Sequence, residues 1–481
     1  MNTRTETAPP PLVLDLDGTL TYTDTLFESA LVLLKRNPLY AFALAWWALQ
    51  GALVLKNALA ARVALNVALL PWRADLVEWV RQQRAAGRKV VLATAAHRSI
   101  ADAAAAHLGL FDAVLATENG VNLKGANKLA AIRATVGPDF VYAGDSKADF
   151  PIWQAGTAAV VAGASASVLA NARSMGPIEA EFSNAGSRAR IWLKALRVHQ
   201  WVKNLLLFVP LFTAFSFGDG DKVMAALLLF IGFSLAASGT YVMNDLWDLE
   251  SDRQHPRKRE RAFASGRITV LHGLMAAAAL MVGGLAVALC VSWQTAAMLA
   301  GYIVLTTAYS WWLKAYVLID VLMLALLYTY RVLAGAVATD IEVSQWLLAF
   351  SIFTFFSLAL VKRCAELVGL QQAGRETTRG RDYRVSDLVV LWPFGAAASI
   401  CSIVVFGLYV GTPETATRFA HPKLLWLVDV GLMYWFARLW IKTSRGEMHD
   451  DPIVFALRDR GSRVTVLAMI LVFVLAMVPI T

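Results

Sequence analysis

The sequence predicts two parts of different fold class: an α/β domain with a doubly wound parallel sheet over residues 1–190, and an all-α transmembrane bundle over residues 196–481. Short apolar runs that alternate with helical stretches predict the first part. Long apolar runs that are broken by short charged loops predict the second. The charged fraction of the chain is 16%, against about 25% in ordinary soluble proteins.

Composition excludes several other classes of protein. The net charge of +9 is explained by membrane orientation rather than by nucleic-acid binding, because the basic residues gather in loops between apolar runs. The three cysteines, Cys290, Cys364 and Cys401, are far apart and lack metal-ligand spacing. The first eleven residues lack the apolar core of a signal peptide. We therefore expect the N-terminus to stay in the cytosol.

Polar residues follow three short apolar runs in the first domain. Leu12–Leu14 precede Asp15 and Asp17, Lys89–Ala93 precede Thr94, and Phe140–Ala143 precede Asp145 and Asp149. Functional residues of parallel α/β sheets gather at the carboxyl ends of strands, so these side chains are expected to share one site. Lys128 follows the second run and supplies a cation.

These residue types suit phosphoryl transfer. One carboxylate can attack phosphorus and form an aspartyl-phosphate. A second carboxyl group two residues later can give a proton to the leaving oxygen. A lysine and Mg²⁺ neutralise the phosphoryl oxygens, and Mg²⁺ prefers carboxylate ligands such as Asp145 and Asp149.

This set of residues resembles the haloacid dehalogenase-like phosphatases. The resemblance implies that Asp15 is the nucleophile and Asp17 the general acid/base. It implies that Thr94 and Lys128 bind the phosphate, with Lys124 as a weaker candidate for the lysine. It also implies that Mg²⁺ binds among four carboxylates, those of Asp15, Asp17, Asp145 and Asp149. Asp145 would bind the ion directly, and Asp149 would support it.

The inserted cap of this domain is expected at residues 24–75 and is unusually apolar. Its stretch Leu39–Leu55, which contains Trp46 and Trp47, approaches the length of a transmembrane helix. A single crossing would separate Asp15 from Thr94 by the bilayer. We expect helices that lie on the membrane surface or pack on the second domain. A buried cap core is an equal alternative.

Nine apolar segments of the second part are long enough to span a membrane. They lie near 203–218, 222–243, 269–292, 295–312, 316–338, 345–361, 386–410, 423–440 and 464–480. With the N-terminus inside, the cytosolic loops hold eighteen Lys and Arg residues, whereas the opposite loops hold Lys222 and Arg418. This bias predicts a multi-pass protein of the bacterial inner membrane, with its charged loops on the side of the first domain.

The strongest signal of the second part is a set of three carboxylates after the second segment. Asp245, Asp248 and Asp252 recur at helical spacing and line one helix face. Like charges at that spacing repel unless a cation bridges them, and Mg²⁺ with a bound diphosphate would do so. His255, Lys258 and Arg261 follow and could bind phosphate oxygens. A solvated charged loop is the alternative, but carboxylates near a membrane core are usually functional.

The segment from Asn244 to Lys258 resembles the UbiA superfamily of intramembrane prenyltransferases, and the resemblance extends over 196–481. Other elements are similar to the decaprenyl-phosphate phosphoribosyltransferases within it: Arg197–Asn204, Tyr309-Ser310 with Lys314 and Asp320, Arg331, Lys362–Leu367, His449–Pro452 and Asp459-Arg460. The resemblance implies catalytic Asp245 and Asp248, a metal ligand at Asp252, and a set of substrate-binding residues: Lys203, Asn244, His255, Lys258, Arg261, Tyr309, Lys314, Arg331, Lys362, Arg363 and Glu366.

Two departures from the wider superfamily are informative. Aromatic prenyltransferases carry a second aspartate-rich cluster after the sixth span, where this chain has Lys362, Arg363 and Glu366. Two cations there favour anionic oxygens over a second metal ion. Ala262 replaces the proline that is common in the family.

Structural roles stay open for several of these residues. Lys203, Lys314 and Lys362 could mark the cytosolic interface, and Arg331 could form a structural ion pair. His449 and Asp450 could cap a helix.

The expected function is bifunctional. The membrane part would join phosphoribosyl diphosphate to a polyprenyl phosphate with Mg²⁺ and release diphosphate, and the phosphatase would remove the 5-phosphate. A prenyl transfer to an aromatic acceptor, or a membrane scaffold with a degenerate phosphatase, are the alternatives. No nucleic-acid partner is expected, and a homo-oligomer stays open.

Overall fold

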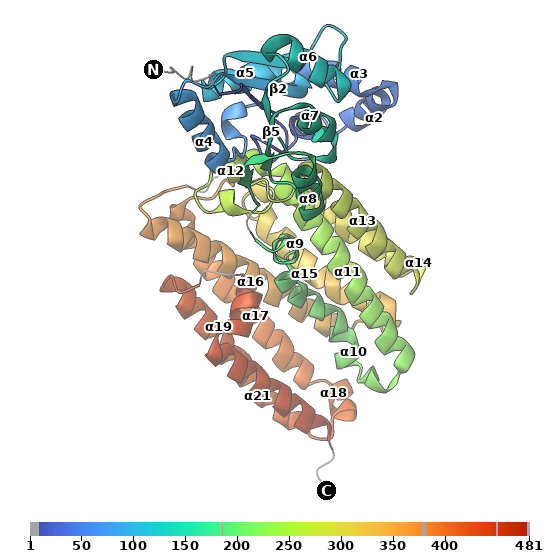
Figure 1. Cartoon of the computed structure of the whole chain (residues 1–481). Coiled ribbons are helices and arrows are strands. Elements are labelled where there is room, and N and C mark those ends of the chain that lie inside the picture. Colours follow the sequence, from blue (N-terminus) through green and yellow to red (C-terminus); the bar gives the residue numbers. More distant parts are fainter. Residues whose placement is uncertain (1–8, 185, 378–380, 449–450, 479–481) are drawn as a thin grey trace, which may run out of the picture. The chain divides into compact units, whose positions relative to one another are not determined.

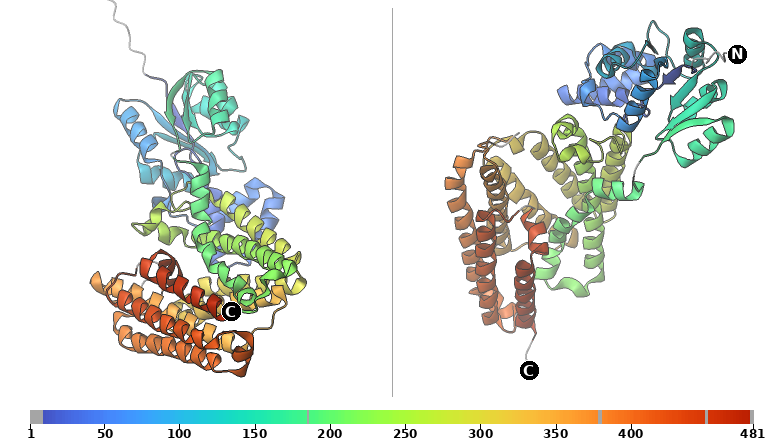
Figure 2. Two further views of the ribbon diagram at one scale, coloured as in Figure 1. Left: turned by 90° about the horizontal axis from the view of Figure 1, so that it is seen from below. Right: turned by 60° about the vertical axis from the view of Figure 1, so that its left-hand side comes forward.

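The computed structural model describes residues 9–184, 186–377, 381–448 and 451–478 (Figures 1 and 2). The chain forms two compact units. Unit 1 contains Met1–Leu196 and also Tyr241–Ala277, whereas unit 2 contains Arg197–Thr240 and Ala278–Thr481. The division therefore does not follow the order of the sequence, because a segment after the second expected span belongs with the first unit.

A parallel six-stranded sheet forms the centre of unit 1, with the strand order β3-β2-β1-β4-β5-β6. Its strands are β1 (Leu12–Leu14), β2 (Val90–His97), β3 (Ala113–Thr117), β4 (Val141–Gly144), β5 (Ala158–Ala162) and β6 (Ile178–Phe182). β1 lies between β2 and β4 and runs parallel to both, so the carboxyl ends of these three strands lie side by side at one edge of the sheet.

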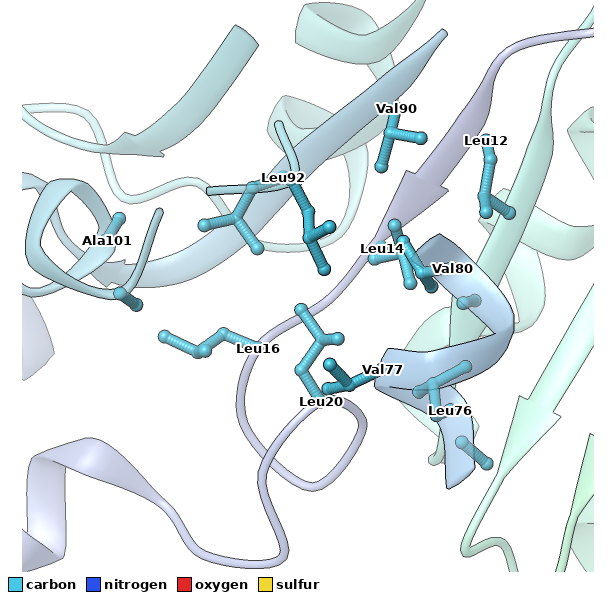
Figure 3. Close-up of a cluster of buried hydrophobic side chains, with 14 of the residues drawn as sticks. Leu12, Leu14, Leu16, Leu20, Leu76, Val77, Val80, Val90, Leu92 and Ala101 are labelled. Carbon is cyan, nitrogen blue, oxygen red and sulfur yellow. The ribbon is translucent and has the colours of Figure 1, made fainter. Parts of the chain in front are cut away.

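Helices cover both faces of the sheet. Leu12, Leu14 and Leu92 pack under α4 (Ala74–Ala85) and α5 (Arg98–Leu108). Figure 3 shows this cluster. Val13 and Val91 face the other side, under α6 (Ala126–Val136), α7 (Phe150–Ala155) and α8 (Ala166–Met175). Burial of both faces explains why these strands read as continuous apolar runs.

Three helices form the cap between β1 and β2: α1 (Thr25–Arg36), α2 (Tyr40–Gln50) and α3 (Ala52–Ala60), followed by the short η1 (Val67–Leu69). Gly51, at φ +117, breaks the apolar stretch into α2 and α3, so it does not form one membrane-length helix. α2 contains no buried residue, and Leu39, Phe42, Trp46 and Leu49 are all more than 60% exposed. The other side of α2 is partly buried, because Tyr40, Leu44 and Trp47 pack against a small cap cluster of Leu33, Leu59 and Val63.

The segment Tyr241–Ala277 packs on the cap within unit 1. It contains the end of α11 (Gly220–Trp247), then α12 (Leu249–Gln254), η5 (Lys258–Glu260) and the start of α13 (Val270–Leu289). Leu246, Leu249 and Phe263 form a buried cluster with Leu31 of α1. Helix α9 (Arg188–Ala195) adds Ala195 to this cluster.

Seven helices in the described part of the chain are long and apolar enough to cross a membrane: Gly220–Trp247, Val270–Leu289, Ile319–Thr339, Gln345–Gln372, Val385–Val410, Pro422–Ser444 and Arg460–Met477. In unit 2, α15 (Ile319–Thr339), α16 (Gln345–Gln372) and α17 (Leu388–Val410) pack side by side, followed by α19 (Leu425–Ser444) and α21 (Arg460–Met477) (Figure 2). Short pieces connect these helices: η4 (Ser216–Gly218), η6 (Leu313–Ala315), η7 (Val385–Asp387), α18 (Pro413–Arg418), η8 (Pro422–Leu424) and α20 (Pro452–Arg458).

Two of the nine expected spans are not among these seven. The segment 295–312 does form a helix, α14 (Trp293–Trp311). The segment 203–218 is instead divided between η3 (Val198–Phe208) and the five-residue α10 (Val209–Thr213). Pro210 cannot donate a helical hydrogen bond, and Phe215 has φ +55, so no continuous helix forms there.

Candidate functional site

The carboxyl ends of β1 and β4 bring the phosphatase-type residues of unit 1 together. Lys128, on α6, places its Nζ 2.8 Å from Asp15 Oδ2 and 3.0 Å from the hydroxyl of Tyr142. The backbone N–H of Leu16 donates to the other oxygen of Asp15 at 2.8 Å. Lys128 rather than Lys124 therefore makes the contact with Asp15, and its charge can hold a phosphoryl oxygen beside that carboxylate.

Asp17 is suited to proton transfer. Its carboxylate accepts hydrogen bonds from the N–H of Thr25 at 2.9 Å and from the hydroxyl of Thr25 at 3.3 Å. Burial, together with the charges of Asp24 and Asp15, raises the pKa of Asp17 well above its ordinary value. A protonated Asp17 can therefore donate to a leaving oxygen.

Asp145 and Asp149 differ in what they can do. Asp149 accepts hydrogen bonds from the N–H groups of Asp145 and Ser146, each at 3.1 Å, and from Tyr142 at 3.0 Å. It therefore shapes the turn that carries Asp145. Burial, with the charges of Asp149 and Asp15, raises the pKa of Asp145 to about 8. This excess of carboxylates over the single ammonium of Lys128 fits a divalent cation.

Thr94 lies completely buried within β2, three residues before its end, and its hydroxyl oxygen accepts from the N–H of Ala96 at 3.0 Å. The hydroxyl hydrogen is the group that could meet a phosphate. The site opens into a cavity of about 530 Å³, within the range of small-molecule sites.

The sequence reasoning missed Lys56 of the cap, which lines this cavity. Burial lowers the pKa of Lys56, while the carboxylates of Asp17 and Asp24 partly oppose that shift. A signal was present, since Lys56 is the only charged residue between Arg36 and Arg62.

The aspartate-rich segment of unit 1 forms a second cluster. The Nη1 of Arg261 lies 3.2 Å from Asp245 Oδ1 and 2.7 Å from Asp252 Oδ2. Asp252 is 1% exposed, and its Oδ1 is buried without a hydrogen-bond partner within the described part of the chain. Lys258 approaches that oxygen only to 4.0 Å.

The donor set of this cluster also fits a divalent cation. No three His, Cys, Asp or Glu side chains converge as a preformed metal site in residues 9–478, apart from the short gaps. The guanidinium of Arg261 instead supplies the positive charge between two of the aspartates. The buried Oδ1 of Asp252 is the atom that a cation would satisfy.

Two other residues of this segment are placed differently. The Nδ1 of His255 accepts from the N–H groups of Arg257 and Lys258, at 3.2 and 3.3 Å, so it caps the loop. Asn244 lies half-buried one turn before Asp248 on α11.

A third cluster lies entirely in unit 2 and is rich in cations. Lys203 and Lys362 both contact Asp451, at 2.7 and 3.3 Å, and the hydroxyl of Tyr328 donates to the same carboxylate at 3.2 Å. Burial raises the pKa of Asp451, but the two ammonium groups outweigh burial and hold the pKa well below its usual range. Asp451 is therefore ionised and holds the two lysines together.

Arg331 lies beside this cluster, within α15. Its guanidinium donates to Asn204 Oδ1 at 3.0 Å, to the carbonyl of Leu327 at 2.6 Å and to the hydroxyl of Tyr302 at 2.5 Å. Arg331 is 5% exposed, and no carboxylate lies within ion-pair distance of it among the residues that the structure describes. Among the described residues, Lys203 and Lys362 therefore share the carboxylate of Asp451, and Arg331 adds a third positive charge beside them, which leaves the cluster attractive to anions.

Arg363 and Glu366 belong to a structural network instead of this cluster. The completely buried guanidinium of Arg363 pairs with Asp320 and Glu366, and the hydroxyl of Tyr383 donates to Asp320. Glu366 also pairs with Arg381 at 3.0 Å. This network ties α15 to α16, and a phosphate that bound Arg363 would have to replace either the buried Asp320 or Glu366, whose side chain is 38% exposed.

The remaining expected residues fall into three groups. Tyr309 packs in the last turn of α14, and Lys314 lies in η6. Asp459 pairs with Arg438 at 3.0 Å and caps α21, which is a structural role. His449 and Asp450 lie outside the described residues.

Taken together, the seven candidate spans and the phosphatase-type centre define a multi-pass membrane enzyme with a hydrolase unit. The UbiA prenyltransferase family matches residues 205–458, and haloacid dehalogenase-like hydrolases match residues 12–154. The chain belongs to the UbiA prenyltransferase family.

Three relatives are similar to different lengths of the chain. The uncharacterized protein y4nM of Sinorhizobium fredii is 38% identical over 456 residues, which are 94% of this chain and 88% of the relative. The nodulation protein NoeC of Azorhizobium caulinodans is 34% identical over 60% of this chain and 93% of its own length. The decaprenyl-phosphate phosphoribosyltransferase of Mycolicibacterium smegmatis is 30% identical over 58% of this chain and 89% of its own length.

Proposed function

We propose that the protein transfers 5-phosphoribose from phosphoribosyl diphosphate to a polyprenyl phosphate, releases diphosphate, and then removes the 5-phosphate from the lipid-linked sugar. The phosphatase site and the charged loops of the membrane part would both face the cytosol at a bacterial inner membrane, as the Lys and Arg bias of the loops favours. Similarity to decaprenyl-phosphate phosphoribosyltransferases supports this donor and acceptor.

The observation that carries the proposal is the composition of the unit 2 cluster. Lys203 and Lys362 share the carboxylate of Asp451, and Arg331 lies beside them with no carboxylate in ion-pair distance among the described residues. Both proposed substrates are polyanions, whereas an aromatic acceptor is neutral and gains little from the buried cations Lys203 and Arg331 and the partly exposed Lys362.

In the transfer step, an oxygen of the lipid phosphate attacks C1 of the ribose. The bond from C1 to the diphosphate oxygen breaks, and the electron pair leaves with the diphosphate. Lys203, Lys362 and Arg331 bind and orient anionic oxygens, and Arg261 screens charge near Asp245 and Asp252. Mg²⁺ held by Asp245, Asp248 and Asp252 would supply further charge stabilisation for the departing diphosphate.

In the phosphatase step, a carboxylate oxygen of Asp15 attacks the phosphorus of the 5-phosphate. The ester bond to the sugar breaks, and Asp17 gives its proton to the sugar oxygen. Water then attacks the aspartyl-phosphate and transfers a proton to Asp17. Lys128 and Thr94 hold the phosphoryl oxygens during both attacks, and Mg²⁺ at Asp145 would neutralise their charge.

The test follows labelled ribose in purified full-length protein in lipid nanodiscs. Phosphoribosyl diphosphate labelled in the ribose is supplied with a polyprenyl phosphate, and the lipid products are identified by mass. The double variant Asp245→Asn/Asp248→Asn should lose at least 100-fold in labelled lipid, because it lacks two carboxylates of the metal cluster. Asp15→Asn should still make the labelled lipid, but that lipid should keep its 5-phosphate.

Matched controls are available on the same elements. Asp221→Asn, at the other end of α11, and Asp139→Asn, before β4, are exposed and should change neither product. Absence of labelled lipid from the wild type, with prenyl diphosphate and an aromatic acceptor giving product instead, would reject the first step. Equal loss of the 5-phosphate in wild type and Asp15→Asn would reject the second.

A further inference from the structure

The phosphatase cavity has a wall that the phosphatase sequence does not supply. Asp15, Asp17 and Lys128 line its floor, and α1 and α3 of the cap line another side. Thr269, Leu271 and His272 line it as well. These three residues belong to unit 1 and lie at the first turn of α13, which is one of the candidate membrane spans.

This wall brings one apolar side chain, Leu271, to the cavity at the start of a candidate membrane span. Only 22% of the apolar stretch of α13 is buried in the protein, so most of that helix is left for lipid contact. The hydroxyl of Thr269 lies 2.7 Å from Nδ1 of His272, which fixes the imidazole at the start of the helix. Leu271 lies between them, half-buried, and lines the cavity.

Lys56 brings a cation to the cavity from the cap. Its Nζ donates to the carbonyl of Ala95 at 2.5 Å and to Oδ1 of Asn122 at 2.8 Å, and both acceptors are neutral. No carboxylate lies within 4 Å of Nζ among the residues that the structure describes. An ammonium with a third donor and no bonded carboxylate favours an anionic ligand.

The position of Lys56 fits the leaving group better than the transferred phosphoryl group. Lys128 contacts Asp15, the attacking carboxylate. Lys56 instead contacts Ala95 and Asn122, so its ammonium lines the same cavity away from the contact between Lys128 and Asp15. Asp17 is the residue that would protonate the leaving oxygen, and the rest of the substrate must extend from that oxygen.

We infer that this cavity is built for a phosphomonoester whose leaving group carries a second, lipid-side phosphate, with Lys56 binding that second phosphate and the first turn of α13 contacting the start of the lipid chain. The inference rests on the proposed phosphatase step and names its specificity-determining residues. A sugar phosphate from the cytosol offers the phosphomonoester alone, whereas a lipid headgroup offers both anions and the chain.

Three substrates separate these contributions in the full-length protein. Ribose 5-phosphate carries neither the second phosphate nor a chain. Ribose 5-phosphate with a methyl phosphate at C1, as a phosphodiester, adds the second phosphate, and the same compound with a geranyl phosphate at C1 adds both. Phosphate release should give kcat/KM values that rise at least tenfold from the first to the second substrate, and again from the second to the third.

Two variants assign the two gains. Lys56→Met should reduce the preference for the methyl diester over ribose 5-phosphate about tenfold, as expected for the loss of one charge-assisted hydrogen bond, and Lys56→Arg should restore it. Leu271→Ser should reduce the preference for geranyl over methyl. Lys89→Met, an exposed lysine just before β2, should change neither ratio.

The outcomes distinguish this inference from the phosphatase itself. Equal kcat/KM values for the three substrates, or a Lys56→Met variant with wild-type ratios, would overturn the inference while Asp15-dependent hydrolysis remains. Hydrolysis of none of the substrates, or hydrolysis that survives Asp15→Asn, would overturn the phosphatase step on which it rests.

Discussion

At the scale of single residues, the charged side chains of unit 2 divide into two kinds. Arg363 pairs with the buried carboxylate of Asp320 and the partly exposed carboxylate of Glu366, and it is held as a structural ion pair. Lys203, Lys362 and Arg331 have one carboxylate among them, and their excess charge is what an anionic substrate can use. The same residue type therefore takes a structural or a binding role according to the number of carboxylates near it.

Asp451 makes a pH-dependent contribution to stability. Its pKa is lower in the folded protein than in the unfolded chain, so its stabilising effect is complete above about pH 4 and decreases as the pH falls below that value. Asp451→Asn leaves the buried ammonium of Lys203 and the partly exposed ammonium of Lys362 without this counter-charge. It should cost roughly 2–3 kcal/mol at neutral pH, less than the loss of a fully buried pair because solvent screens Lys362.

Thermal unfolding in detergent between pH 7 and pH 3.5 checks this expectation. The difference in stability between wild type and Asp451→Asn should stay constant down to about pH 5 and become smaller below pH 4. Asp221→Asn, which removes an exposed carboxylate, should show no comparable difference. A difference that grows as the pH falls would contradict the assigned direction of the pKa shift.

At the scale of elements, close packing in unit 2 depends on glycine. An added Cβ at Gly335 of α15 would lie 2.0 Å from the backbone carbonyl oxygen of Leu207 in η3. Small residues let membrane helices approach neighbouring backbone this closely. The contact fixes η3, which carries Lys203 and Asn204, against the helix that carries Arg331.

Gly335→Ala should therefore destabilise unit 2 by about 1–3 kcal/mol, because the backbone of η3 must move. It should also raise the KM for phosphoribosyl diphosphate, since Lys203 moves with η3. Gly369→Ala in α16 is the matched control, because a Cβ there meets nothing within 4 Å. That control should be neutral or slightly stabilising, and equal losses in both variants would refute the packing argument.

At the scale of the whole molecule, unit 1 combines parts of the two families in one core. Glu28 of the phosphatase cap and Arg253 of the aspartate-rich segment form an ion pair at 2.6 Å, with side chains only 3% and 6% exposed. Thr23 also donates to Glu28, at 2.7 Å. Arg253 directly follows Asp252, so this pair fixes the segment that carries the proposed metal ligands.

Glu28→Gln should destabilise unit 1 by roughly 3–5 kcal/mol, because it leaves the buried guanidinium of Arg253 without a counter-charge. It should also weaken the Mg²⁺ dependence of the transferase activity by loosening Asp252. The double variant Glu28→Leu/Arg253→Met removes both charges and should recover part of the stability.

The exposed pair Arg81–Glu78 supplies the control for this prediction. Its side chains are 54% and 58% exposed, so Glu78→Gln should cost less than about 1 kcal/mol. Denaturant unfolding of the full-length protein measures both pairs, and equal small costs would show that the Glu28–Arg253 pair does not hold the segment.

The sequence alone determined the parts of this protein that depend on neighbouring residues. The strands that end just before Asp15 and Asp145 follow from short apolar runs. Seven of the nine expected spans follow from segment length and hydropathy. The broken segment at 203–218 was not foreseen, although Pro210 was a visible signal.

Only the tertiary structure decided which distant residues meet. Asp320 and Arg363, or Lys203 and Asp451, are separated by tens to hundreds of residues, and local patterns do not specify such partners. The grouping of Tyr241–Ala277 with the phosphatase was likewise invisible, because burial of Leu246 against Leu31 depends on two apolar surfaces that form only after each segment folds.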